Sequence, residues 1–164
     1  MVFKGNLDGT AVLYTNGVGG VTHDTTDLSG SGSASFWSEF VQSSSSNSLA
    51  LVAFNNFPYT GSSMPNAQFY SLFTVGAKTV AGFSPGANGV SVSFRSGNAT
   101  YWSPQATQNA QSNFIITDTQ QINDGSGIIK VRIRATFNLR VVNQSTGAMK
   151  TITDGVFVGT FAKD

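Results

Sequence analysis

The side chains that could perform acid–base chemistry are few in this chain of 164 residues. Glu39 is the only glutamate, His23 is the only histidine, and cysteine is absent. Glycoside hydrolysis requires two carboxyl groups held about 5 to 10 Å apart. Three aspartates directly precede a glycine, where an aspartate usually bonds to the backbone of a turn: Asp8, Asp124 and Asp154. The carboxylates that could act elsewhere are Asp24, Asp27, Glu39 and Asp118.

A hydrolase is the least favoured class of function. His23-Asp24 lies in a segment followed by many serines, which would suit a nucleophilic triad, but no G-x-S-x-G motif is present. We therefore predict that the protein is not an enzyme and uses no cofactor.

Asp24 and Asp27 also raise the alternative of a calcium site. Their carboxylates and the carbonyls of a Gly/Thr-rich segment are the hard oxygen ligands that Ca²⁺ prefers. However, no D-x-[DN]-x-[DN]-G loop is present, and one histidine cannot form a zinc site alone. The sequence favours an aspartate-rich surface loop, so we predict no metal.

The aromatic side chains with polar tips are the best candidates for ligand contact. Flat aromatic rings beside amides and hydroxyls suit stacking on sugar rings. The predicted glycan-binding residues are Tyr59, Asn98, Tyr101, Trp102 and Gln105. The alternative is that these tyrosines and the tryptophan close the ends of the core with one hydrogen bond each, as buried aromatics usually do.

A basic stripe could attract phosphates, but the composition argues against nucleic acid. The stripe comprises Lys130, Arg132, Arg134 and Arg140, whereas the whole chain has a net charge of +1. Such charges also keep the wet face of a long strand soluble. We therefore expect no nucleic-acid partner.

Charged residues are only 10% of the chain, compared with roughly 25% in an average soluble protein. A surface of hydroxyls and amides is common in extracytoplasmic β-proteins, so we expect a secreted or surface-anchored protein. Met1 leads directly into a strand-like segment without a visible export signal. No apolar run reaches the roughly 18 residues of a membrane helix.

The carboxyl-terminal third carries the clearest structural pattern. From Ile129 to Val141 every odd residue is apolar and most even residues are polar, which predicts a long strand with one buried face. A turn over Asn143 to Gly147 leads to a second strand through Phe157, and Asp154-Gly155 is typical of a β-bulge. The chain is therefore expected to end in a long antiparallel hairpin.

The rest of the chain predicts short strands and one helix. Asp8-Gly9 centres a hairpin over 3–15, and 49–55 is a strand buried on both faces. Phe69, Leu72 and Phe73 have helical spacing, whereas the segment from Asn16 to Gly32 is expected to be a long loop. Further strand candidates are 33–41, 78–83, 89–94, 99–102 and 113–121.

These elements predict an all-β fold: one antiparallel β-sandwich domain over 1–164, with about 8 to 10 strands, one short helix and a long C-terminal hairpin. A closed barrel is the alternative architecture.

The order of several short motifs resembles a known family. The motifs are Leu7-Asp8-Gly9, the aromatic helix at 69–73, Gly97 to Trp102, Phe114-x-Ile116-Thr117, and the hairpin from Thr136 to Phe157. This order is similar to that of uncharacterised β-sandwich domains in exported lipoproteins of Bacteroidetes. The resemblance implies a β-sandwich at the cell surface and no particular mechanism.

Taken together, the sequence favours a non-catalytic extracytoplasmic module that binds glycans. The alternative is an adhesion or assembly domain that binds another protein. A concave patch of exposed aromatics would favour the sugar, and an unpaired edge strand would favour the protein.

Overall fold

The computed structural model describes residues 1–15, 20–29, 33–42, 48–59, 61, 64–81, 88–96 and 98–163. Within these ranges the side chains of 20–29, 41–42, 48–49, 56, 96 and 105 are not described. The strands are β1 (Val2–Leu7), β2 (Thr10–Thr15), β3 (Gly20–Ser29), β4 (Ser33–Gln42), β5 (Ser48–Pro58), β6 (Gly76–Lys78), β7 (Gly89–Ser96), β8 (Ala99–Trp102), β9 (Asn113–Ile122), β10 (Ile129–Asn143) and β11 (Met149–Lys163). The helices are α1 (Asn66–Leu72) and the short 3₁₀-helix η1 (Gln105–Thr107).

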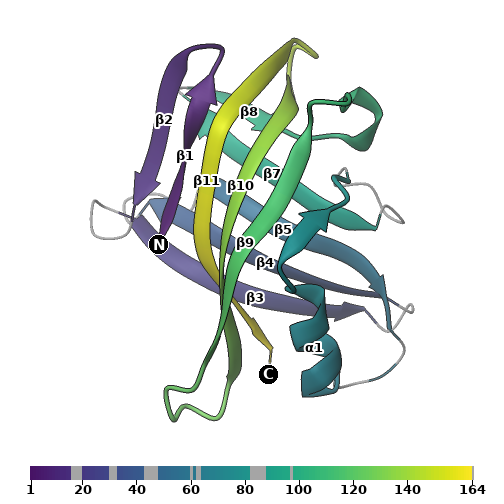
Figure 1. The fold of residues 1–164 in the computed structure, drawn as a ribbon. Coiled ribbons are helices and arrows are strands. Elements are labelled where there is room, and N and C mark those ends of the chain that lie inside the picture. Colours follow the sequence, from purple (N-terminus) through teal and green to yellow (C-terminus); the bar gives the residue numbers. More distant parts are fainter. Residues whose placement is uncertain are drawn as a thin grey trace.

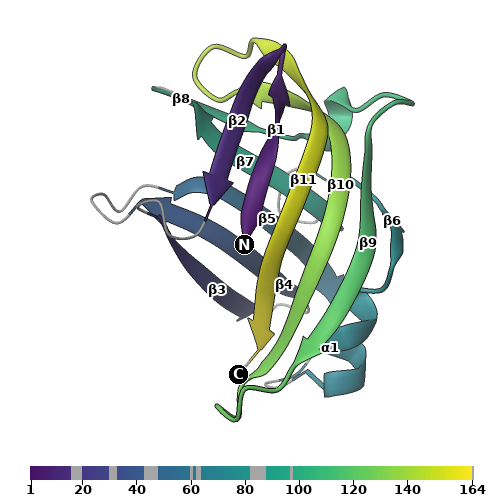
Figure 2. The same ribbon diagram turned by 60° about the vertical axis from the view of Figure 1, so that its left-hand side comes forward.

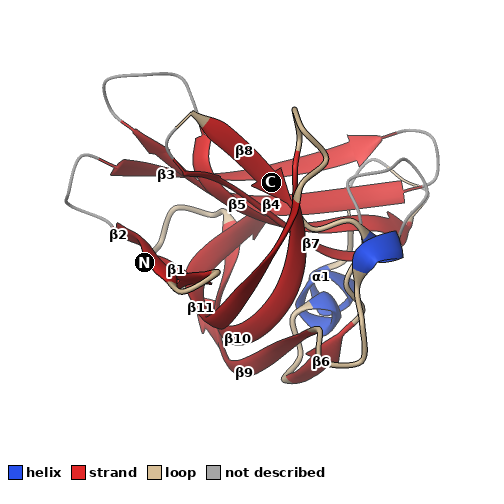
Figure 3. Cartoon of the chain, turned by 90° about the horizontal axis from the view of Figure 1, so that it is seen from above, coloured by secondary structure: helices blue, strands red, loops and turns tan. Residues whose placement is uncertain are grey.

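The strands form an all-β sandwich in which every pairing between them is antiparallel. One layer has the order β2-β1-β11-β10-β9-β6, and the other has the order β8-β7-β5-β4-β3 (Figures 1 and 2). The layers join where the end of β10 pairs with β8, Val142 opposite Trp102. Viewed from above, the two layers enclose a wedge, with α1 at its open side (Figure 3). The sheet is open, as expected for a sandwich rather than a closed barrel.

The long C-terminal hairpin is confirmed and forms the centre of the first layer. Val131, Ile133 and Phe137 on β10 are buried, whereas the alternate residues of that strand point outward. The bulge is also confirmed: Phe137 lies opposite Gly155, the register then shifts before Leu139, and Asp154 has a φ of 53°. The two-residue period therefore decides which face of the hairpin enters the core.

Phenylalanine fills most of the space between the layers. The core cluster includes Phe3, Phe36, Phe54, Phe114 and Phe161, all with no exposed surface. Their rings meet mostly in tilted or edge-to-face arrangements, such as Phe54 against Phe161 with centroids 5.1 Å apart. Because the chain has no cysteine, this packing of large rings holds the fold together.

One predicted loop is wrong. The segment from Asn16 to Gly32 was expected to be irregular, but residues 20–29 form β3, which pairs with β4 along its whole length. β3 lies at the edge of its layer. The segment contains few apolar residues, so the sequence carried no periodic signal for this strand. Of the strand expected at 78–83, only Lys78 belongs to a strand, the end of β6, and Val80 forms an isolated bridge with Val90. Residues 82–83 lie outside the described residues.

Candidate functional site

The predicted glycan-binding residues do not meet on one surface. β5 runs antiparallel to β7 with Asn55 opposite Gly89, so Tyr59 lies beyond the start of β7. Asn98 lies beyond the other end of β7, in the turn before β8. Eight residues of extended strand span more than 20 Å. Tyr59 and Asn98 therefore cannot contact the same sugar ring.

Tyr101 faces the core instead of solvent. Its side chain is 7% exposed, and its ring stacks on Phe94 with centroids 5.5 Å apart. The ammonium nitrogen of Lys150 lies 5.8 Å from the centroid of the same ring. Neither face of the Tyr101 ring is therefore open to a ligand. Gln105 belongs to η1, and its side chain lies outside the described residues.

Trp102 follows Tyr101 in β8 and so faces the opposite way, onto the outer surface. Its neighbours in register are Val142 on β10 and Ser93 on β7, and Met149 lies opposite Val142 with 58% of its surface exposed. Trp102 itself is partly exposed. The outer face thus carries a strip of apolar side chains across three strands and, at β7, a hydroxyl.

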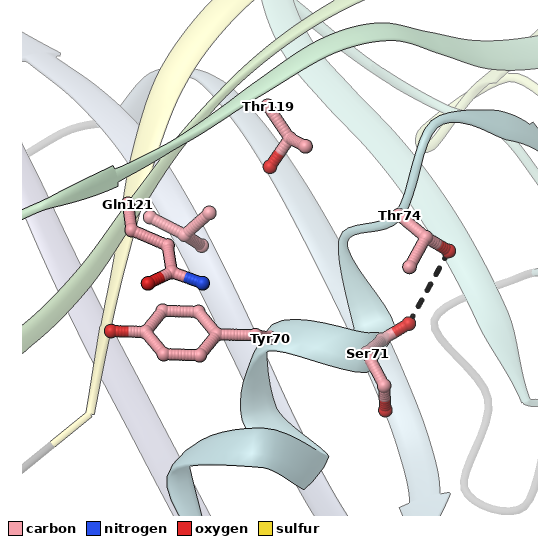
Figure 4. A pocket seen from close by; sticks show the side chains of 6 residues that line it. Tyr70, Ser71, Thr74, Thr119 and Gln121 are labelled. Carbon is pink, nitrogen blue, oxygen red and sulfur yellow. Dashed lines mark hydrogen bonds between the residues drawn. The ribbon is translucent and has the colours of Figure 1, made fainter.

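A different site, which sequence reasoning missed, lies between α1 and β9. A cleft of about 320 Å³ opens there (Figure 4). It is lined by Tyr70, Ser71, Thr74, Thr119, Gln121 and Val131. α1 lies beside the lower half of β9 in the views of the whole chain (Figures 1 and 2). The only signal in the sequence was that the second half of β9 has polar residues at positions where a sandwich strand would carry apolar ones.

The helix α1 places Tyr70 in this cleft by burying its other face. Phe69 and Phe73 are fully buried, and the ring of Phe36 lies 5.1 Å from that of Phe69 and 6.2 Å from that of Phe73. The N–H of Phe69 donates to the carbonyl of Pro65 over 3.0 Å, which closes the first turn. Tyr70 is one position further around the helix, so its ring points sideways, toward β9.

The interior of the cleft is lined by neutral groups. In Figure 4 the side chains of Thr119 and Gln121 project toward the helix, and the Gln121 amide lies against the Tyr70 ring. The Thr74 hydroxyl instead bonds to the Ser71 carbonyl over 3.4 Å. Lys78, whose pKa burial lowers, donates to the Thr74 hydroxyl over 3.1 Å. No lining residue carries a charge, so the cleft suits an uncharged group.

One edge of β9 is unpaired along this cleft. β9 pairs with β10 from Asn113 to Ile122, but β6 covers its other edge only from Phe114 to Ile116. Among the described residues, no strand pairs with that edge beyond Ile116. The residues 117–121 are all exposed. A sheet edge of this kind presents backbone donors and acceptors to a partner strand.

Hydrogen bonds to β10 show which residues of β9 present their backbone to this edge. The Thr117 hydroxyl donates to the Arg134 carbonyl over 3.2 Å, and the Asn138 N–H donates to the Asn113 side chain over 3.3 Å. The even residues of β10 therefore direct their backbone groups toward β9. Since partners in an antiparallel pair alternate between bonded and non-bonded positions, the residues of β9 opposite them face β10 in return.

Asp118 and Gln120 lie opposite Arg134 and Arg132, so their backbone groups are used within the sheet. Thr119 and Gln121 consequently direct their N–H and C=O groups outward, to the unpaired edge. The same two residues send their side chains into the cleft. Backbone hydrogen bonding and a side-chain pocket thus become available at the same place.

Charges lie on the outer face of this region. Arg132, Arg134 and Asp118 are exposed, and within the part of the chain that the structure describes they form no ion pair. At the tip of the β9–β10 hairpin, Lys130 and Asp124 do form one, over 2.7 Å. Of the basic stripe predicted from the sequence, Arg132 and Arg134 are therefore solvated, with Asp118 beside them. Arg140 is partly buried and donates to the Thr107 carbonyl.

The groups considered for catalysis lie in three strands: Glu39 is in β4, Asp118 is in β9, and the remaining ones, including both calcium candidates, are in β3. His23, Asp24 and Asp27 belong to that strand, and their side chains lie outside the described residues. Across the described ranges, no three histidine, aspartate or glutamate side chains cluster as metal ligands would. In the same ranges, no helix has the length and apolar character needed to cross a membrane.

The similarity to exported lipoprotein domains remains a prediction. Comparison of the chain with protein-family models, with curated proteins and with solved structures found no match.

Proposed function

We propose that this chain is a non-catalytic binding module that captures an extended segment of another protein at the unpaired edge of β9. The observation that carries the proposal is the double role of Thr119 and Gln121. Their backbone groups point to the edge and their side chains line the cleft. Strand addition uses these two features together: main-chain hydrogen bonds supply affinity, and pockets for alternate side chains supply specificity.

The low charge of the chain supports a location outside the cytoplasm for this module. With charged residues at 10%, its surface relies on hydroxyl and amide groups. An adhesion or assembly role at the cell surface is consistent with such a surface. A protein partner fits this edge better than a sugar fits the predicted residues, since Tyr59 lies far from Asn98 and Tyr101 is buried.

The proposal can be tested by selecting peptides from a displayed library of random twelve-residue sequences on the immobilised protein. Selected peptides are then measured by calorimetry against Thr119→Pro, which removes an N–H from the unpaired edge. The matched control is Thr119→Ala, which keeps the N–H and removes only the hydroxyl. We expect loss of binding in Thr119→Pro and at most a few-fold weakening in Thr119→Ala. Equal binding to both variants would overturn strand addition.

A second candidate function is glycan binding at the outer face around Trp102. The observation that favours it is the partly exposed indole beside Ser93, with Thr100 facing the same way on β8. Of the residues predicted for this role, Asn98 and Trp102 lie in the same hairpin. A glycan array probed with the chain and with Trp102→Ala tests it. Binding that is lost in Trp102→Ala but kept in Thr119→Pro would assign sugar recognition to this face.

A further inference from the structure

The alternation of side chains along β9 restricts which peptide segment the edge can accept, provided that the proposed strand addition holds. In an antiparallel or parallel pair, the residue of the added strand opposite Thr119 must point its side chain to the same face as Thr119. That face is the cleft, with Val131 and Tyr70 among its lining residues. The neighbouring residue of the added strand must point to the outer face, opposite Asp118.

The cleft position requires an uncharged side chain. The lining residues offer a tyrosine ring, a valine, hydroxyls and an amide, none of them charged. The ammonium of Lys78 contacts this lining only through Thr74, to whose hydroxyl it donates. A charged side chain placed against Tyr70 and Val131 would lose hydration, and neither residue can form an ion pair with it. An aliphatic or aromatic side chain would instead bury apolar surface against Tyr70 and Val131. A volume of about 320 Å³ accommodates a large side chain.

The outer position favours a basic side chain. Asp118 is exposed, with Arg134 opposite it on β10 and the unpaired edge on its other side. Adjacent strands lie about 4.8 Å apart, so the added side chain would lie about twice as far from Arg134 as from Asp118. At physiological ionic strength the screening length is about 8 Å, which weakens the repulsion from Arg134 more than the attraction to Asp118.

We infer that the segment bound at the β9 edge carries an apolar side chain that enters the α1–β9 cleft and, next to it in sequence, a basic side chain that faces Asp118.

The experiment uses blocked octapeptides of serine and threonine in which two adjacent central residues are varied. The two parent peptides carry Lys-Leu and Leu-Lys, which cover both strand directions. In each parent, Glu then replaces either Leu or Lys. Binding is followed by the backbone amide NMR signals of Thr119 and Gln121 in the full chain. We expect Glu in place of Leu to weaken binding about tenfold or more, since that carboxylate would lose hydration against the Tyr70 ring and Val131. Glu in place of Lys should weaken it about two- to fivefold, the range of an exposed ion pair.

Asp118→Lys is the charge-reversal control. The Asp118 backbone pairs with β10 and its side chain is exposed, so the substitution changes the charge without disturbing the core. This variant should prefer Glu over Lys at the outer position while keeping the preference for Leu in the cleft. Equal affinities for all peptides, with β9 signals still shifted, would overturn this inference and leave strand addition standing.

If no peptide shifts the Thr119 and Gln121 amides, the proposed function itself fails. Loss of these signals with rising protein concentration, without peptide, would assign the edge to a second copy of the chain and overturn both proposals.

Discussion

The ring of Phe137 occupies the space that a side chain on Gly155 would need. The two residues lie opposite each other in the β10–β11 pair, and a Cβ added to Gly155 would lie 2.4 Å from Cδ2 of Phe137. Phe137 is buried, so its ring has little room to move. The glycine of the bulge is thus required by packing in the core.

Gly155→Ala should therefore lower the free energy of unfolding by about 1 to 3 kcal/mol, as overpacking in cores usually does. Urea denaturation measures the change. Thr153→Ala, at an exposed position two residues earlier, is the control and should stay within about 0.5 kcal/mol of the original chain. Similar losses in both variants would contradict the packing explanation.

The bulge also depends on Asp154, whose backbone is left-handed. It has a φ of 53°, and its carboxylate accepts a hydrogen bond from the Asn6 side chain over 3.1 Å. Asp154→Ala should cost about 1 to 2 kcal/mol, because alanine tolerates this conformation poorly. Asp154→Gly loses the same hydrogen bond but relieves the backbone, so it should cost less. Thermal unfolding of the two variants side by side measures the difference, and the opposite order would refute this account.

Tyr14 joins the two layers at their edge, since its hydroxyl donates to the carbonyl of Arg95 on β7. Burial raises the pKa of Tyr14 above its ordinary value of about 10, and the positive charge of Arg95 partly opposes this. Above about pH 10 the Tyr14 hydroxyl loses its proton in the unfolded chain, whereas it keeps that proton in the folded chain. Below about pH 10 the ionisation of Tyr14 should not reduce the free energy of unfolding. The free energy should then fall as the pH rises toward the pKa of Tyr14 in the folded chain.

Tyr14→Phe removes both the hydrogen bond and the titration. It should lower stability at neutral pH by about 0.5 to 1.5 kcal/mol and reduce the loss at alkaline pH. Unfolding curves between pH 8 and about 11 provide the measurement. A parallel decline in both proteins over this range would show that Tyr14 does not cause it.

The direction of the β9 backbone predicts opposite outcomes for proline at neighbouring positions. Thr119→Pro should leave the fold intact, because its N–H points to the unpaired edge, where proline is tolerated. Gln120→Pro should lower stability by about 3 kcal/mol, because that N–H is used in the pairing with β10. Circular dichroism melting compares the two. If Thr119→Pro destabilised the protein more than Gln120→Pro, the N–H of Thr119 would face β10 and that of Gln120 would face the unpaired edge, which contradicts our assignment.

Much of the fold was predictable from local pattern. The alternation from Ile129 to Val141 predicted the long strand, Asp8-Gly9 the first hairpin, and the spacing of Phe69 and Phe73 the helix. All three are confirmed by the structure. These signals are local, because the spacing of apolar residues along a single strand or helix decides which of its side chains can be buried.

The candidate site was not predictable in the same way. Tyr101 and Trp102 are adjacent and equally aromatic, and only the pairing of β8 decides that the first enters the core and the second faces outward. The cleft joins Tyr70 of α1 to Thr119 and Gln121 of β9, some fifty residues apart in the chain. The sequence alone determined a layered body of antiparallel strands with a core of phenylalanine. Tertiary structure decided which strand edge stays unpaired and what lies beside it, because both depend on contacts between segments distant in sequence.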